Sequence, residues 1–372
     1  MRAILLSAVT TPARSPCDEA FIRAGIARPC VDSDAPQRAG WVLTAAILGS
    51  SLAFIDGTAV NVALPALQSS LHATIAEVQW VVEAYALLLA ALLLTGGSLG
   101  DTYGHRRVFA IGVLSFALAS AWCGFAPTIE QLIIARAVQG AGGALLVPGS
   151  LAMISISFPS AARGPAIGTW SAWTSVTAAI GPVLGGWLAE HASWRWVFAI
   201  NLPIAAVVLA IVQWRVPERA ITRAGVPHRL DWAGATLTAL GLGGVVYGCL
   251  EASVWAAVAG GVLLVAFVVV EARSAAPMMP LTLFRSRNFA GANLLTLFLY
   301  AALSGVLLFV PLNLIQVQGY SATAAGAALL PFIILLVLLS RWAGGLVTRV
   351  GARPTLVVGA LVASAGFALF AR

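Results

Sequence analysis

The chain has 372 residues, of which 60% are hydrophobic and 9% are charged, whereas soluble domains carry about 25% charged residues. This composition excludes an ordinary soluble domain and predicts an all-α, polytopic membrane protein. The net charge of +7 comes from 21 arginines without any lysine, and we attribute it to orientation in a bilayer, not to binding of nucleic acid.

Eleven apolar segments are long enough to cross a bilayer, which requires about 20 mostly apolar residues. The eighth is short and is interrupted by Gly260 and Gly261. Residues 1–38 precede the first segment and do not fit the pattern, so we expect a cytoplasmic tail or a mis-assigned start codon. The predicted spans are 41–63, 78–99, 107–126, 129–153, 165–188, 195–214, 231–250, 254–271, 289–311, 322–347 and 354–371.

The placement of the arginines predicts the orientation of these spans. With a cytoplasmic N-terminus, 18 arginines fall in cytoplasmic segments, two (Arg195 and Arg372) fall outside, and Arg136 lies within a span. A wrong number of spans would invert every later loop and destroy this asymmetry. We therefore predict a multi-pass protein of the inner (plasma) membrane with its N-terminus in the cytoplasm.

The first span contains an ionisable side chain, Asp56. A carboxylate at that depth costs about 3 kcal/mol to insert, so such a residue is a functional candidate. It opens the stretch DGTAVNVALP, which runs through Asn61 to Pro65.

Two further charged residues, Glu83 and Arg136, lie within the second and fourth spans. Counted along each helix from the outer surface, Asp56, Glu83 and Arg136 agree in depth within roughly 6 Å. We therefore expect a shared polar cluster, which acts either as a proton-linked switch or as a static ion pair that fixes packing. Asp56 is the preferred proton-coupling residue, while Glu83 fits an interfacial position equally well.

The loop after the second span reads GSLGDTYGHRR and contains Gly97, Asp101, Gly104, Arg106 and Arg107. Its glycines permit a tight turn between two spans. The aspartate can accept hydrogen bonds from a neighbouring helix N-terminus or pair with an arginine. We expect this loop to latch the cytoplasmic side in one conformational state.

A degenerate copy of this loop, GGLVTRVGAR, occurs at residues 344–353. Threonine stands at Thr348, where the first loop has its aspartate. Internal repetition is typical of transporters built from two similar halves, and loss of the carboxylate predicts a weaker latch on this side.

The fifth span contains the sequence GPVLGG, which begins with Gly181 and Pro182 and ends with Gly185 and Gly186. Glycines allow close approach between helices, and an internal proline kinks a helix. The stretch therefore predicts a site of tight helix packing.

The cysteines and histidines show no spacing typical of metal ligands, so we predict no metal site and no cofactor. Paired catalytic carboxylates, a nucleophile elbow and a phosphate-binding loop are not found in the sequence. We therefore expect that the protein is not an enzyme.

The stretches at 56–65, 97–107, 136–144, 181–186 and 194–203 resemble, in order, the motifs of the fourteen-helix drug:proton antiporters of the major facilitator superfamily. His105 departs from the arginine usual in that family. The resemblance covers residues 41–372 and implies a six-helix bundle at 39–214, a linker with two extra helices at 215–271, and an incomplete bundle of three helices at 272–372.

The resemblance implies proton-coupled efflux of amphipathic or cationic organic compounds. The partners are then a small-molecule substrate, protons and the lipid bilayer, without nucleic acid, and no partner protein is identified. Export of a native metabolite is one alternative. A second is a C-terminally truncated remnant without active efflux, because the chain supplies eleven of the family's fourteen helices.

Overall fold

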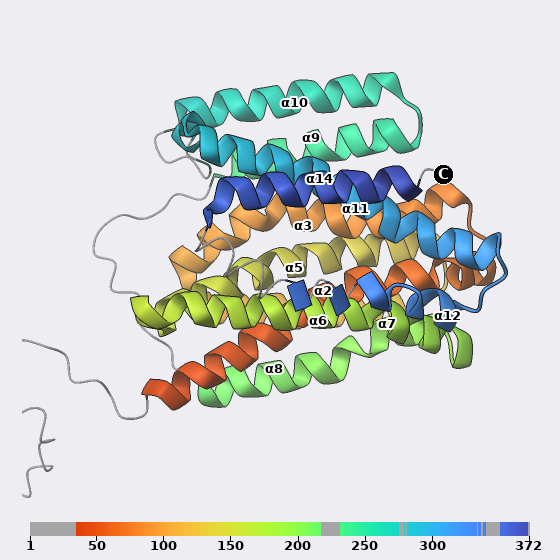
Figure 1. The fold of residues 1–372 in the computed structure, drawn as a ribbon, viewed down its shortest axis with the longest axis horizontal. Coiled ribbons are helices and arrows are strands. Elements are labelled where there is room, and N and C mark those ends of the chain that lie inside the picture. Colours follow the sequence, from red (N-terminus) through yellow and green to blue (C-terminus); the bar gives the residue numbers. More distant parts are fainter. Residues whose placement is uncertain are drawn as a thin grey trace, which may run out of the picture.

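The computed structural model describes residues 35–216, 231–274, 279, 281–332, 334–335, 338–339 and 350–370, and every regular element within them is helical (Figure 1). The all-α prediction is therefore confirmed. The helices are α2 (Ala35–Leu71), α3 (Ile75–Tyr103), α4 (His105–Phe125), α5 (Ile129–Ser157), α6 (Ser160–His191), α7 (Arg195–Ala199), α8 (Asn201–Arg215), α9 (Trp232–Leu250), α10 (Val254–Arg273), the 3-10 helix η1 (Leu281–Arg285), α11 (Arg287–Gln316), α12 (Ala322–Ala327) and α14 (Ala352–Phe370).

Eight helices among the described residues are long and apolar enough to cross a membrane, counting α7 and α8 as one. Shorter apolar helices occur at Ala322–Phe332 and Arg353–Leu369. The tenth predicted span, 322–347, is interrupted after Ala327, and residues 340–349, which hold most of the degenerate loop copy, lie outside the described residues. The same is true of residues 1–34 and of 217–230 in the predicted linker.

Local capping fixes where several helices begin. Thr74 and Glu77 form a capping box at the start of α3, in which the Thr74 amide donates to Glu77 Oε2 at 2.7 Å. Gly104 joins α3 to α4 with a φ of +98°, a conformation that glycine adopts without strain. We call the two ends of the first bundle the Thr74 end and the Gly104 end.

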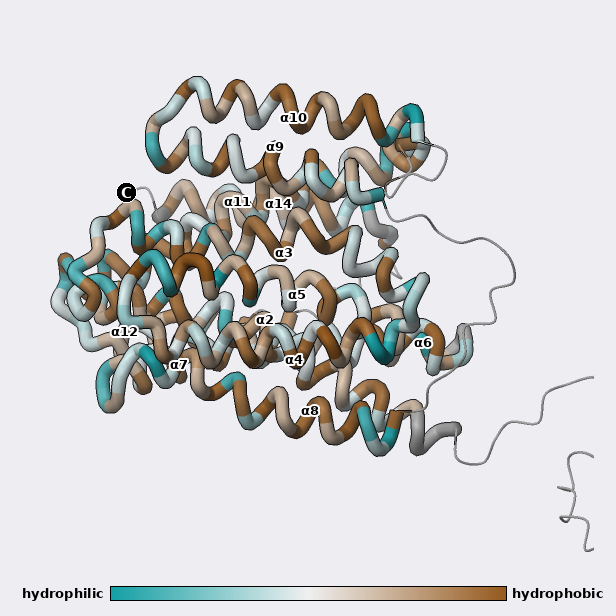
Figure 2. Tube along the Cα trace, turned by 180° about the vertical axis from the view of Figure 1, so that it is seen from behind, coloured by the Kyte–Doolittle hydropathy of each residue, from teal (hydrophilic) through white to brown (hydrophobic). Residues whose placement is uncertain are grey.

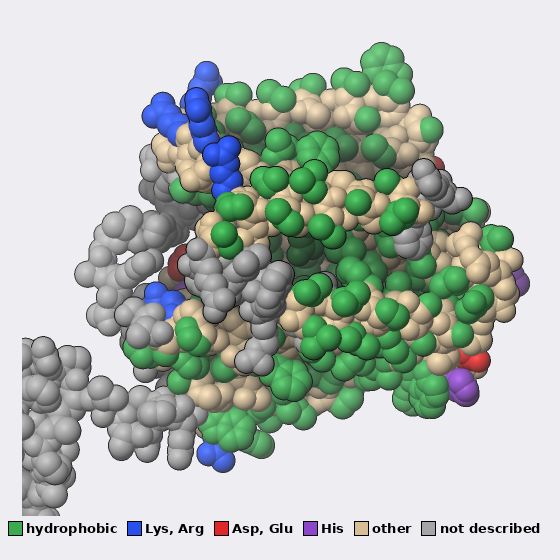
Figure 3. Space-filling view, in the orientation of Figure 1, with side chains coloured by type: hydrophobic (Ala, Val, Ile, Leu, Met, Phe, Trp, Pro, Cys, Tyr) green, Lys and Arg blue, Asp and Glu red, His purple; other side chains and the backbone are tan. Residues whose placement is uncertain are grey.

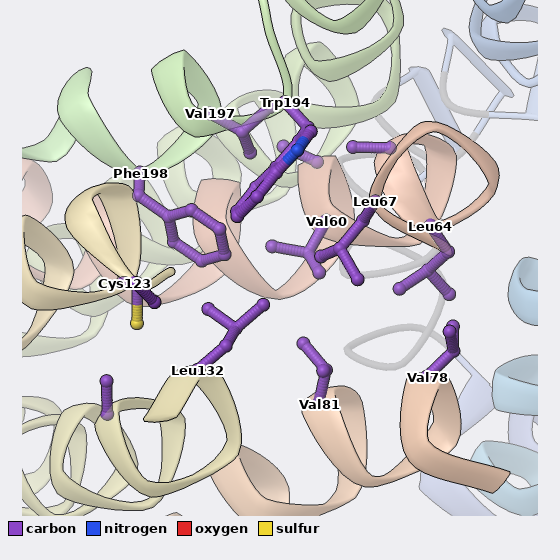
Figure 4. Close-up of a cluster of buried hydrophobic side chains, with 14 of the residues drawn as sticks. Val60, Leu64, Leu67, Val78, Val81, Cys123, Leu132, Trp194, Val197 and Phe198 are labelled. Atoms are coloured by element: carbon purple, nitrogen blue, oxygen red, sulfur yellow. The ribbon is translucent and has the colours of Figure 1, made fainter. Parts of the chain in front are cut away.

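The helix α2 packs against α3, α5, α6 and α8, and two apolar clusters lie along it. The cluster toward the Thr74 end gathers side chains from five helical segments (Figure 4); it includes Val60, Leu64, Leu67, Val78, Val81, Cys123, Leu132, Trp194, Val197 and Phe198. The cluster toward the Gly104 end includes Ala53, Phe109, Phe116, Met153 and Val208. Because Ala53 belongs to one cluster and Ile55 to the other, Asp56 lies where they meet.

The helices α9 and α10 form an antiparallel pair beside α3 (Figure 1). Glycines bring them close together: a Cβ on Gly248 would lie 2.6 Å from the Cβ of Ala257. Trp80 on α3 donates its indole N–H to Glu251 at 3.2 Å and packs on Tyr247. The pair therefore has a defined contact with the first bundle.

The outer surface is predominantly apolar along the helices (Figures 2 and 3). Basic side chains gather at the Gly104 end (Figure 3). Among the basic residues near the end of α10 and the start of α11, Arg273, Arg285 and Arg287 are exposed. An apolar girdle with charged ends is the surface that a bilayer requires.

Candidate functional site

The centre of the first bundle contains a buried ion pair between Asp56 on α2 and Arg136 on α5. Nη1 of Arg136 donates to Oδ2 of Asp56, and the two side chains are 1% and 0% exposed. The structure thus brings together two of the three charged residues that the sequence predicted to share a cluster.

The other carboxylate oxygen of Asp56 accepts two hydrogen bonds. Gln139 Nε2 donates to Oδ1 at 2.9 Å, and Asn201 Nδ2 donates to it at 3.0 Å. Ser120 on α4 links these two amides, because its Oγ accepts from Asn201 at 2.9 Å and from Gln139 at 3.3 Å. Side chains from four helices, α2, α4, α5 and α8, therefore meet around one carboxylate. We call the five residues of this group the Asp56 cluster; they are Asp56, Ser120, Arg136, Gln139 and Asn201.

Arg136 has further partners of its own. Its Nε donates to the carbonyl oxygen of Val81 at 3.0 Å, and its Nη1 to Gln139 Oε1 at 2.7 Å. The guanidinium also lies over the ring of Tyr85, 4.3 Å from its centroid. A buried arginine needs such partners because an unpaired charge in an apolar interior is costly.

Gln139, Ser120 and Asn201 were not predicted as site residues. Two had a signal: Gln139 follows Arg136 by three residues, which places both on one helix face, and Asn201 is a polar residue at the start of an apolar run. No sequence signal marks Ser120, which lies in an ordinary apolar span.

The break between α7 and α8 positions Asn201. The sequence predicted one continuous span at 195–214, but α7 ends at Ala199 and α8 begins at Asn201. Pro203 explains the break, because it has no N–H to donate to the carbonyl of Ala199. Ser120 Oγ donates to the Phe198 carbonyl at 2.9 Å, so the segment before the break is tied to the Asp56 cluster.

Glu83 lies apart from the cluster. It is half-buried on α3, and the hydrogen bonds of the cluster run between other residues. Trp80, three residues before it, and Leu87, four residues after it, both face α9. The predicted three-residue cluster of Asp56, Glu83 and Arg136 is therefore not what the structure shows.

The loop at the Gly104 end joins helices of the same bundle. Asp101 Oδ1 lies 3.4 Å from Nε2 of His105, one turn later. Arg106 donates to the carbonyl oxygens of Val212 and Gln213, both at 3.1 Å, and so caps the C-terminus of α8. Gly97 lies against Pro148 of α5, and Arg107 is exposed.

The glycines of α6 sit between two neighbours. A Cβ on Gly181 would lie 3.0 Å from the Ile55 carbonyl oxygen, and one on Gly185 2.8 Å from the Cα of Ala59, so this face packs tightly on α2. A Cβ on Gly186 would lie 2.7 Å from the Ala322 carbonyl carbon, so the next face packs on α12.

The contact between α6 and α12 continues at Gly326 and Glu190. A Cβ on Gly326 would lie 2.8 Å from the carbonyl carbon of Pro182. The amide of Thr323 donates to Glu190 Oε2 at 3.0 Å. The first bundle and α12 therefore meet at the Thr74 end.

Asn61 and Pro65, the remaining predicted motif residues, are half-buried on α2. Within the described part of the chain, no three His, Cys, Asp or Glu side chains are grouped so that they could hold a metal ion.

The chain is similar to known proteins over most of its length. Residues 46–372 match the model of the Major Facilitator Superfamily. The multidrug resistance protein Stp of Mycobacterium tuberculosis (strain CDC 1551 / Oshkosh) is 38% identical over 330 residues, which are 85% of this chain and 60% of that protein. The tetracenomycin C resistance and export protein of Streptomyces glaucescens is 34% identical over 87% of this chain and 61% of its own length.

The puromycin resistance protein pur8 of Streptomyces alboniger is 38% identical over 90% of this chain and 68% of its length. The chain thus spans about 60% of the length of the first two relatives. Among solved structures, the peptide transporter POT in complex with sulfate has a TM-score of 0.59 at 16% identity, covering 86% of this chain and 73% of that one. The D-xylose-proton symporter has a TM-score of 0.56 at 16% identity, with 83% and 69% covered. These two share the fold.

Proposed function

Because the chain belongs to the Major Facilitator Superfamily, we propose that it is a proton-coupled exporter of amphipathic or cationic organic compounds. It is a multi-pass membrane transporter and not an enzyme. The substrate class is supported by relatives named for resistance to, or export of, multiple drugs, tetracenomycin C and puromycin.

The observation that carries the proposal is the buried carboxylate of Asp56. Its negative charge is balanced by Arg136 and stabilised by donors from Gln139 and Asn201. Binding of a proton would neutralise the charge that attracts Arg136 and weaken the hydrogen bonds that Asp56 accepts from the two amides. Binding of a single proton can therefore change the packing of α2 against α5 and α8. Coupling of transport to protons requires such a change.

We further propose the plasma membrane as the location, with the Gly104 end in the cytoplasm. The exposed arginines at that end support this orientation. The predicted division into a bundle at 39–214, a linker with two helices at 215–271 and a second bundle from 272 belongs to the same proposal. The partners are then protons, the small-molecule substrate and the bilayer.

The test is uptake of puromycin by inside-out membrane vesicles under an imposed pH gradient. Vesicles with the unaltered chain should accumulate puromycin, and a proton uncoupler should abolish this. Asp56→Asn should reduce accumulation to the level of vesicles without the protein, because asparagine cannot bind and release a proton.

The matched control is Asp231→Asn. Asp231 caps α9 by accepting from the Gly234 amide at 2.8 Å, and asparagine caps helices equally well, so transport should persist. If Asp56→Asn transports at the unaltered rate, the Asp56 cluster is a static packing element. If the unaltered chain shows no uncoupler-sensitive accumulation, the proposal of active export by this chain is wrong.

A further inference from the structure

The helix α2 turns different faces to its neighbours. Thr58 and Ala59 contact the glycines of α6. A Cβ on Gly57 would lie 3.8 Å from the Tyr85 ring of α3. Asp56 faces the interior of the bundle. The remaining stripe holds Phe54, Asn61 and Pro65, which follow one another by seven and four residues and so share one side of the helix.

Helices that follow α10 in the chain contact α2 as well. α2 also packs against α11 and α12, and Leu308 of α11 joins the apolar cluster toward the Thr74 end. The contact of Gly186 with Ala322 closes the same end. Asn61 lies about 15 Å along the helix from Leu71, the last residue of α2, which places it almost three turns inside this end.

One side-chain oxygen on this stripe, Oδ1 of Asn61, is buried. Oδ1 makes no hydrogen bond to any residue that the structure describes. The Asn201 oxygen is in the same state, but the amide nitrogen of Asn201 donates to both Asp56 and Ser120. A buried carbonyl oxygen without a donor is destabilising, and such groups in folded proteins call for an explanation such as a ligand.

We propose that Asn61 contacts the transported compound, with its Oδ1 accepting a hydrogen bond from an N–H or O–H group. Phe54, whose side chain is 37% exposed, contacts the apolar part of the same compound. Asn61 follows Phe54 by seven positions, which is about 10 Å along the helix and matches the length of a drug-sized molecule. The inference rests on the proposed function and specifies its substrates: amphipathic compounds with a hydrogen-bond donor about 10 Å from an apolar group.

The placement also separates the substrate from the proton. Asn61 follows Asp56 by five positions, so their side chains point about 140° apart around α2. Substrate at Asn61 and a proton at Asp56 would therefore act on one helix from two sides without contacting each other.

The experiment measures equilibrium binding of two lipophilic aromatic cations to the purified 372-residue chain. Ethidium carries amino groups that donate hydrogen bonds, whereas tetraphenylphosphonium has no donor. Asn61→Leu should weaken ethidium binding about 10-fold, equivalent to about 1.4 kcal/mol, and leave tetraphenylphosphonium binding unchanged. The variant should melt no lower than the unaltered protein, because leucine removes an unpaired polar group.

The matched control is Gln68→Leu, which removes an amide from the same helix near its end, where water is available. Its affinity for both cations should not change. Phe54→Ala should weaken both. Equal effects of Asn61→Leu on the two cations, or a lowered melting temperature, would show a structural role for Asn61 and overturn the inference while the proposed function stands. Failure of the unaltered chain to bind either cation would count against the proposed function itself.

Discussion

Arg136 and Asp56 form an ion pair that solvent does not reach, since their side chains are 1% and 0% exposed. Either charge alone would be costly in this interior, because burial removes the hydration that stabilises it. The pair is tolerated because polar groups around it present matching dipoles, namely the Val81 carbonyl and the amides of Gln139 and Asn201. Stability should therefore depend on the two charges together.

The first prediction tests this dependence. Arg136→Gln should lower the free energy of unfolding by about 3–5 kcal/mol, because it leaves the Asp56 carboxylate buried without its counter-charge. The double variant Arg136→Gln/Asp56→Asn should be less destabilised than Arg136→Gln, since neither charge remains. Chemical unfolding in detergent measures both, and a double variant no more stable than Arg136→Gln would contradict a coupled pair.

The second prediction concerns the glycines of α6. Gly185→Ala should destabilise the protein by about 1–3 kcal/mol, because its methyl group would approach the backbone of Ala59 too closely. Gly168→Ala on the same helix is the control. A Cβ there meets nothing within 4 Å, so the substitution should be neutral or slightly stabilising. Equal melting temperatures for the two variants would show that α6 is not held tightly against α2.

The third prediction concerns Arg195, which the sequence places outside the membrane against the general trend. Its Nη1 donates to the carbonyl oxygen of Ala126 at 2.9 Å, and its guanidinium lies 4.3 Å from the Trp194 ring. Arg195 thus caps the C-terminus of α4, as Arg106 caps that of α8. Arg195→Ala should lower stability by about 1–2 kcal/mol, a charge-assisted hydrogen bond discounted for partial exposure. Exposed Arg163→Ala should melt as the unaltered protein does.

The fourth prediction concerns orientation. Reporter fusions after Arg163 should be cytoplasmic, and fusions after Gln68 and Gly319 should be external, because the exposed arginines favour a cytoplasmic Gly104 end. Paired reporters that are active on opposite sides of the membrane provide the measurement. An external signal after Arg163 would invert the first bundle and remove the basis for the proposed direction of export.

Apolar length alone located most helices, because a membrane span leaves an unbroken run of hydrophobic residues that any chain position reveals. The predicted span at 107–126 and the helix α4 at His105–Phe125, for instance, nearly coincide. The interruption at Ile200 was missed, although Pro203 marks it, because the surrounding residues are apolar apart from Asn201. Length does not show where a helix breaks or how far it extends beyond the membrane.

The sequence by itself determined the all-helical membrane architecture, the family resemblance and the importance of Asp56 and Arg136, since a charge inside an apolar run is visible without a structure. Only the tertiary structure decided which side chains meet those charges. Asp56 and Asn201 are 145 residues apart, and their contact depends on how α2 and α8 are rotated about their axes. That rotation also turns Glu83 away from the cluster and leaves the Asn61 oxygen without a partner in the described chain. Helix rotation is set by packing among distant segments, so no local pattern encodes it.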